Sequence, residues 1–144
     1  MENIIILIVE DAAPMRTFIK ACIKSSFPGK VEVEEAGSGE SAMTMLAAKP
    51  CDIVLCDWNL PGMKGTEILV WMKGQDRLKD IPFLMLTAHN EKDLVTGALN
   101  MGASDFIMKP VTAEVLSKRL MSAIRTVLAV RKSKAAEGDS AGGG

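Results

Sequence analysis

The sequence is poor in the residues that build disulfide frameworks and soft-metal sites. It has three cysteines, Cys22, Cys51 and Cys56, and a single histidine, His89. An odd number of cysteines without Cys-x-x-Cys spacing argues against both a disulfide framework and a zinc site. A single histidine also excludes a histidine-rich transition-metal centre. We therefore expect three reduced cysteines that serve as packing residues.

The chain also lacks an excess of charge of either sign and any long apolar run. Its 17 basic and 18 acidic residues leave a formal charge of -1, so no electrostatic field favours nucleic acid or an anionic membrane as a partner. The apolar run near the start, in MENIIILIVED, has no basic residue before it, and no run approaches the ~20 apolar residues of a membrane span. We expect a cytoplasmic protein that binds neither nucleic acid nor membrane.

What the chain has is a regular alternation of apolar runs and helical segments. Five apolar runs bounded by turn signals begin near residues 4, 31, 52, 83 and 105: IIILIV, VEVEEA, DIVLC, PFLML and DFIM. Such runs predict strands, most of them buried on both faces, and the helical segments between them predict a parallel sheet with helices on both sides. The length of 144 residues suits a single α/β domain. Glutamate at alternate positions of VEVEEA places the second strand at an edge.

Three helices are predicted from apolar residues that repeat with helical spacing. Their stripes are Met15, Phe18, Ile19 and Cys22; then Leu94, Ala98 and Met101; and finally Leu116, Leu120, Ile124, Val127 and Leu128. Pro14 lies where a first helical turn tolerates proline, Asn90 suits an N-cap and Gly102 suits a helix end. The last helix is predicted to run from about residue 112 to 131. We assign residues 1–131 to the domain and 132–144, which have little to bury, to a flexible tail.

Polar residues stand at the carboxyl ends of four predicted strands. Glu10-Asp11, Asp57, Thr87-Ala88 and Lys109-Pro110 end the first, third, fourth and fifth strands. In a parallel sheet these ends meet at one rim, which is where such folds bind ligands. Three acids in one crevice imply a hard divalent cation, and Mg²⁺ suits an open carboxylate site. An acid, a metal, a hydroxyl and a lysine are the parts needed to form an aspartyl phosphate.

Four motifs in register, VEDAAP, LCDWNLPGMKG, LMLTA and GASDFIMKP, resemble the receiver domain of two-component response regulators, the CheY-like family. The resemblance covers residues 3 to about 130. It implies a flavodoxin-like (βα)5 fold, a doubly wound parallel sheet of five strands in the order 2-1-3-4-5. It also implies that Asp57 is the phosphoacceptor, and that Asp11, Asp57 and the backbone carbonyl of Asn59 bind Mg²⁺, with Glu10 reaching the metal through water.

The same resemblance assigns roles to residues on the later strands. Thr87 is similar to the hydroxyl residue that moves to the phosphoryl group, and Lys109 to the lysine that pairs with it. Phe106 occupies the position of an aromatic switch residue, often tyrosine in the family, and Pro110 follows a peptide bond that is usually cis. Asn59 and His89, each two residues past a site residue, are candidates for tuning the rate at which water attacks the phosphoryl group.

The function implied is a signalling switch and not an enzyme. We expect a monomer that accepts a phosphoryl group from a sensor histidine kinase or a histidine phosphotransfer protein. It would then bind a downstream target through the fourth helix, fifth strand and fifth helix, about 90–102 and 105–131. The sequence leaves open a chemotaxis or a phosphorelay pathway, and a receiver cut from a longer regulator with an output domain.

Two other functions are weighed against the switch. An aspartyl-phosphate phosphatase of the haloacid dehalogenase type needs a second acid two residues after the nucleophile, and that position is Asn59. A flavin carrier needs a phosphate-binding loop after the first strand, and EDAAPM is acidic instead.

Overall fold

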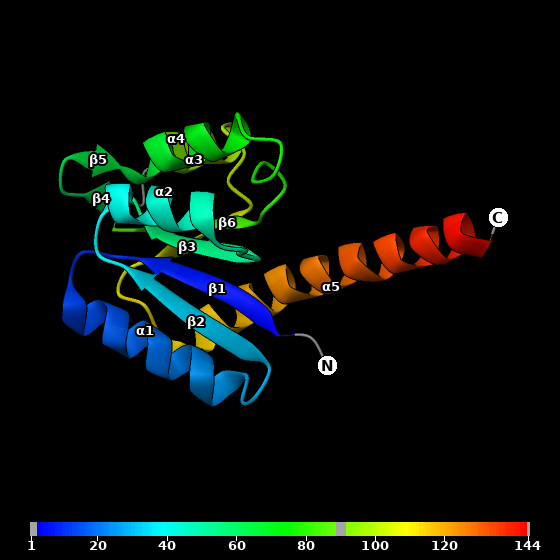
Figure 1. Ribbon diagram of the computed structural model, residues 1–144. Helices are drawn as coiled ribbons and strands as arrows, with labels where there is room; N and C mark the ends of the chain where they lie inside the picture. Colours follow the sequence, from blue (N-terminus) through cyan, green and yellow to red (C-terminus); the bar gives the residue numbers. More distant parts are fainter. Residues whose placement is uncertain (1–2, 89–91, 144) are drawn as a thin grey trace.

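The computed structural model describes residues 3–88 and 92–143, and its centre is a parallel sheet (Figure 1). The five strands are β1 (Ile4–Val9), β2 (Val31–Ala36), β3 (Ile53–Asp57), β6 (Phe83–Thr87) and β7 (Asp105–Met108). They lie in the order β2-β1-β3-β6-β7. In chain order of these five strands this is 2-1-3-4-5, so the predicted flavodoxin-like fold and the edge position of the second strand are confirmed.

Helices cover both faces of the sheet. Helices α1 (Ala13–Ser26) and α5 (Ala113–Gly143) lie on one face, and α2 (Gly39–Ala48), α3 (Gly65–Lys73) and α4 (Lys92–Asn100) lie on the other (Figure 1). Side chains alternate along a strand, so Ile6 and Ile8 of β1 join the core beneath α1 and α5, whereas Leu7 and Val9 join the core beneath the other three helices. Every residue of β3 and β6 is buried, as expected for central strands of a two-sided sheet.

The local signals around the helices are mostly confirmed. Pro14 lies in the first turn of α1, and Gly102 follows α4 with φ of +108°, a conformation that glycine adopts without strain. The predicted N-cap at Asn90 lies outside the described residues. All three cysteines are free, with Cys22 and Cys56 buried and Cys51 partly buried. No helix in the described ranges is long and apolar enough to cross a membrane.

Three residues assigned to buried stripes are exposed instead. Phe18, Met101 and Leu128 have exposed fractions of 43%, 48% and 47%. The surface of a helix that packs against the sheet can be narrower than its apolar stripe. In α1 the buried residues are Ile19, Cys22 and Ile23, so Phe18 lies at the side of the packed surface.

The predicted end of the last helix was wrong. Helix α5 continues from Ala113 to Gly143, and its final turns extend away from the sheet (Figure 1). Residues 132–137, KSKAAE, contain no proline or glycine, and alanine, lysine and glutamate favour the helix without tertiary contacts. The flexibility of residues 132–144 and the domain boundary at residue 131 stay predictions.

A small hairpin was not predicted. Strands β4 (Asn59–Leu60) and β5 (Met63–Lys64) pair antiparallel directly after β3. Pro61 and Gly62 form the turn, and Gly62 has φ of +73°. The Pro-Gly pair was the available signal, since this pair favours a tight turn that brings its flanking residues together.

Candidate functional site

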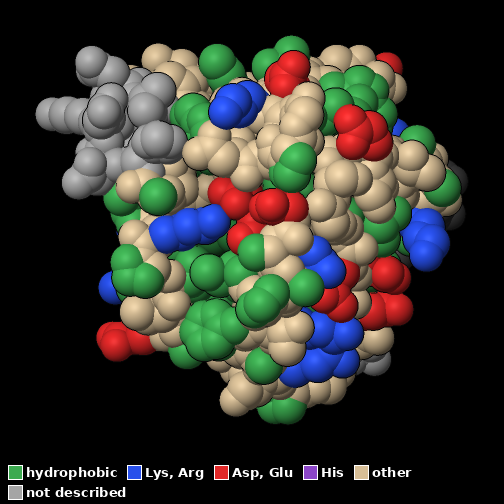
Figure 2. Space-filling view, turned by 90° about the vertical axis from the view of Figure 1, so that its left-hand side faces the viewer, with side chains coloured by type: hydrophobic (Ala, Val, Ile, Leu, Met, Phe, Trp, Pro, Cys, Tyr) green, Lys and Arg blue, Asp and Glu red, His purple; other side chains and the backbone are tan. Residues whose placement is uncertain are grey.

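The strand register brings the predicted site residues to one rim. Glu10 follows β1, Asp57 ends β3, Thr87 ends β6, and Lys109 follows β7. The pairs Val9–Cys56, Asp57–Leu86 and Thr87–Met108 lie opposite one another, so these strand ends are nearly level. Figure 2 shows acidic side chains gathered near the middle of this face, with basic side chains beside them.

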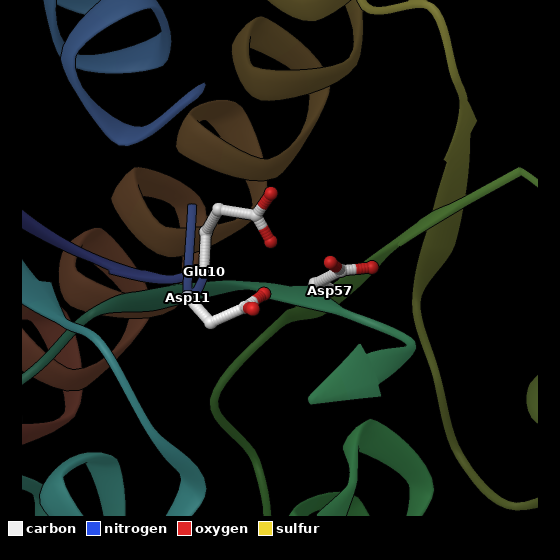
Figure 3. A group of neighbouring side chains, drawn as sticks. All are labelled: Glu10, Asp11 and Asp57. Carbon is white, nitrogen blue, oxygen red and sulfur yellow. The ribbon is translucent and has the colours of Figure 1, made fainter. Parts of the chain in front are cut away.

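Three carboxylates share one small space. Oxygens of Glu10, Asp11 and Asp57 lie within 4.8 Å of one another, and their side chains point into a common region (Figure 3). Asp11 is exposed, whereas Glu10 is only 2% exposed and its Oε2 has no hydrogen-bond partner among the described residues. The pKa of Glu10 is raised to about 8, mainly by burial and then by the adjacent Asp57 carboxyl, while the Lys109 ammonium acts in the opposite direction.

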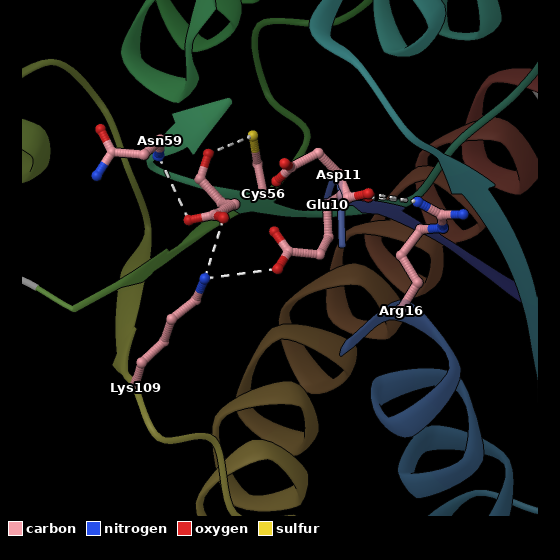
Figure 4. A network of polar contacts seen from close by, with 7 residues as sticks. Glu10, Asp11, Arg16, Cys56, Asn59 and Lys109 are labelled. Atoms are coloured by element: carbon pink, nitrogen blue, oxygen red, sulfur yellow. Dashed lines mark hydrogen bonds and ion pairs between the residues drawn. The ribbon is translucent and has the colours of Figure 1, made fainter. Parts of the chain in front are cut away.

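Lys109 is the cation between the acids. Its Nζ lies 3.0 Å from Asp57 Oδ2 and 3.5 Å from Glu10 Oε1 (Figure 4). Burial lowers the pKa of Lys109, but the neighbouring carboxylates of Asp57 and Glu10 outweigh it, so the net shift is upward and the ammonium keeps its charge. The Lys109 backbone amide donates to Thr87 O at 2.8 Å, which ties the ends of β6 and β7 together. The Lys109–Pro110 bond is cis, as the resemblance implied.

These groups fit a hard divalent cation. Mg²⁺ takes oxygen ligands and is usually held by one or two carboxylates, and this cluster offers Asp11 and Asp57 with Glu10 close behind. One lysine cannot neutralise the carboxylates of both Asp11 and Asp57, and within the described part of the chain the buried Glu10 Oε2 has no donor. A cation would relieve both deficits. The Asn59 backbone amide donates to Asp57 Oδ1 at 3.3 Å, so Asn59 lies beside Asp57, and its predicted roles in metal binding and rate tuning stay predictions.

Two further predicted site residues, Thr87 and Phe106, lie on the neighbouring strands β6 and β7. Thr87 is buried at the end of β6, beside both β3 and β7. Phe106 lies on β7 and packs partly against the core beneath α2, α3 and α4. His89 lies outside the described residues. The roles of Thr87, Phe106 and His89 stay predictions.

Gly65 contacts the backbone of Asp57, which sequence reasoning missed. A Cβ built at Gly65 would lie 2.5 Å from the carbonyl oxygen of Asp57. The Gly65 amide also donates to Trp58 O at 2.8 Å, and Trp58 N donates to Leu86 O at 2.8 Å. These contacts hold the start of α3 directly against the end of β3. The glycine after the hairpin in GMKG was the only sequence signal.

Gly65→Ala is expected to destabilise the protein by about 2 kcal/mol, because backbone atoms must move to accept the new methyl group. Chemical denaturation followed by circular dichroism measures the change. Gly97→Ala is the matched control, since a Cβ there has nothing within 4 Å and α4 should gain up to ~1 kcal/mol of helix propensity. Equal stability of Gly65→Ala and the parent would contradict the close packing at Asp57.

Cys56, the residue before Asp57, is a buried thiol. Cys56 Sγ donates to Asp57 O at 3.3 Å (Figure 4). Burial raises the pKa of Cys56, and the negative charges of Asp57 and Glu10 raise it further. The raised pKa and the burial both agree with the prediction that Cys56 is a packing residue.

Most of the chain matches the sequence profile of one family. The profile of the response regulator receiver domain covers residues 6–121. The chain belongs to the response regulator receiver domain family. This receiver domain is 36% identical over 115 residues to the chemotaxis protein CheY of Pseudomonas aeruginosa, an alignment that covers 80% of this chain and 91% of that protein.

Solved receiver domains share the fold. The chemotaxis response regulator CheY4 of Vibrio cholerae has a TM-score of 0.78 and 26% identity, over 84% of this receiver domain and 98% of that chain. The receiver domain of a sensor histidine kinase from Pseudomonas aeruginosa has a TM-score of 0.75 and 25% identity, over 85% and 98% of the two chains. That structure has a magnesium ion coordinated in its active-site cleft.

Proposed function

We propose that this receiver domain accepts a phosphoryl group on Asp57 from the phosphohistidine of a sensor kinase or phosphotransfer protein, and then binds a downstream protein differently. The observation that carries the proposal is the position of Asp57, buried beside two other acids with the Lys109 ammonium at 3.0 Å. A buried carboxylate with a fixed cation at one oxygen suits a nucleophile whose product carries extra negative charge.

The chain's own groups support each part of the transfer. A carboxylate oxygen of Asp57 attacks phosphorus, the P–N bond to the donor imidazole breaks, and its electron pair stays on the imidazole nitrogen, which is then protonated. Lys109 neutralises part of the charge on the phosphoryl oxygens, and the Asn59 amide keeps the carboxylate oriented. The carboxyl group lies at the rim of the sheet, where a donor protein can approach.

The metal proposed for this site is Mg²⁺. Asp11, Asp57 and the backbone carbonyl of Asn59 would hold it, with Glu10 reaching it through water. When bound, the ion neutralises charge on the phosphoryl oxygens. The magnesium ion in the similar Pseudomonas aeruginosa receiver domain supports this assignment.

The pathway is proposed from the relatives. The identity to a CheY favours a chemotaxis-type output, while the receiver of a sensor kinase keeps a phosphorelay open. We propose a cytoplasmic, monomeric switch without turnover of an external substrate, which binds its target through α4, β7 and α5. Thr87 and Phe106 would connect Asp57 to that face.

The proposal is tested with acetyl phosphate as a small donor. The protein should gain the mass of one phosphoryl group when Mg²⁺ is present and little without it, measured by intact-mass spectrometry. The product should be cleaved by hydroxylamine, which attacks acyl phosphates. A protein that gains no mass at any Mg²⁺ concentration would overturn the proposed function.

Mg²⁺ is also expected to stabilise the protein against heat, because the unfolded chain has no assembled site. At free Mg²⁺ of 100 times Kd the gain is about 2.7 kcal/mol, or roughly 5–10 °C in melting temperature. Asp11→Asn removes a ligand but also relieves repulsion among the acids, so it should melt no lower than the parent without metal and gain little with it. Asp76→Asn, at a fully exposed side chain in the α3–β6 loop, should gain as much as the parent. A large Mg²⁺-dependent rise in Asp11→Asn would contradict Asp11 as a ligand.

A further inference from the structure

Arg16 binds the backbone that carries two of the three acids. From the first turns of α1 its Nη1 donates to Glu10 O at 2.7 Å and lies 3.4 Å from Asp11 O. Figure 4 shows the guanidinium directed at this segment, on the side away from the carboxylates of Glu10 and Asp11. The arginine therefore contacts the main chain of the metal-site residues and not their acidic groups.

Arg16 is itself held from a second element. Its Nε lies 3.5 Å from Glu35 Oε1 on β2, and a Cβ built at Gly37 would lie 3.3 Å from its Nη1. The side chain is 23% exposed, so water screens these contacts only partly. A planar fork with several donors can bind two carbonyls and a carboxylate together, which a lysine ammonium does less well.

The segment after β1 has few other anchors. The Glu10 amide donates to Ala36 O at 3.1 Å, which is the last ladder bond between β1 and β2. The next residues enter α1 through Ala12, an N-cap without a side-chain hydrogen bond. No N-cap side chain therefore accepts from the first helix amides to fix the chain at this point. Arg16 anchors the same segment in a different way, by donating to the carbonyls of Glu10 and Asp11.

We propose that Arg16 is a positioning residue for the metal site: by holding the carbonyls of Glu10 and Asp11 it sets where their carboxylates lie relative to Asp57. The inference rests on the proposed function. The inference predicts that the loss of Arg16 changes the affinity for Mg²⁺ in the direction opposite to that expected from its charge alone. Removing a cation near a metal site strengthens metal binding if only charge matters, whereas loss of positioning weakens it.

The test is the affinity for Mg²⁺, measured by isothermal titration calorimetry on the complete chain. Arg16→Met should weaken binding about tenfold, in line with the effect of removing groups that orient metal ligands. Lys20→Met is the matched control, because Lys20 lies on the same helix and pairs with the same Glu35 at 3.2 Å but contacts neither carbonyl. It should leave the affinity within about twofold of the parent. Arg16→Lys should fall between the parent and Arg16→Met.

A second measurement does not need the metal. In the metal-free protein, hydrogen exchange at the Glu10 amide should become at least several-fold faster in Arg16→Met than in Lys20→Met, since the segment loses its anchor. Binding by Arg16→Met that equals or exceeds the parent's would overturn the inference, and so would unchanged exchange. If the parent does not bind Mg²⁺, the proposed function fails and this inference with it; if the parent binds and Arg16→Met is unchanged, only this inference fails.

Discussion

The Asp57→Asn protein is expected to gain no phosphoryl group from acetyl phosphate and Mg²⁺ under conditions in which the parent gains one. The substitution replaces the nucleophilic carboxylate with an amide of almost the same size. It also removes a charge from a crowded acidic cluster, so we expect the protein to remain folded. Intact-mass spectrometry measures the gain, and circular dichroism checks the fold.

Asp11→Asn, tested in the same assay, distinguishes the loss of a metal ligand from the loss of the proposed acceptor. It keeps Asp57 and loses a proposed ligand, so it should still gain mass but more slowly at a given Mg²⁺ concentration. Lys109, which lies 3.0 Å from Asp57 Oδ2 in the parent, is unchanged by the substitution and should still supply part of the electrostatic stabilisation. If Asp57→Asn gains the same mass as the parent, the acceptor is a different residue.

Thr87→Ala is expected to accept the phosphoryl group on Asp57 but to pass little of the change to the proposed binding face. Thr87 is buried on β6, which lies between β3, the strand that ends at Asp57, and β7, the strand that carries Phe106. A distant face can respond only through an element with two arrangements that the phosphoryl group biases. A hydroxyl drawn to the phosphoryl group would leave space that the Phe106 ring can enter.

Amide chemical shifts before and after phosphorylation measure this effect. In the parent the changes should spread over α4, β7 and α5, and in Thr87→Ala they should be much smaller over that face. Thr87→Ser keeps the hydroxyl and should restore them, while Thr126→Ala on an exposed part of α5 should behave as the parent. Equal shifts in Thr87→Ala and the parent would refute this switch, as would parental changes that lie mainly on α1 and α2.

The strands and the rim of the site were predictable because their signals are local. The segments IVLC at 53–56 and FLML at 83–86 contain no charged residue, which favours central strands of a sheet covered on both faces. Once the sheet is parallel, the residues that follow each strand must meet at one edge. This rule alone predicts, from the sequence, that Glu10, Asp57, Thr87 and Lys109 lie at the same edge of the sheet.

The exposure of single side chains, the backbone contacts at the site and the pKa of Glu10 depend on residues distant in the sequence, so only the tertiary structure determined them. Phe18 and Leu128 belong to apolar stripes, yet the width of the helix contact left both exposed. Gly65 lies against Asp57 O, a contact for which the glycine in GMKG was the only sequence signal. Arg16 donates to the carbonyls of Glu10 and Asp11, and no periodic pattern in the sequence indicates that contact. The pKa of Glu10 rises to about 8 mainly because of burial, which follows from how the strands, loops and helices pack around it and cannot be seen in a pattern along one segment.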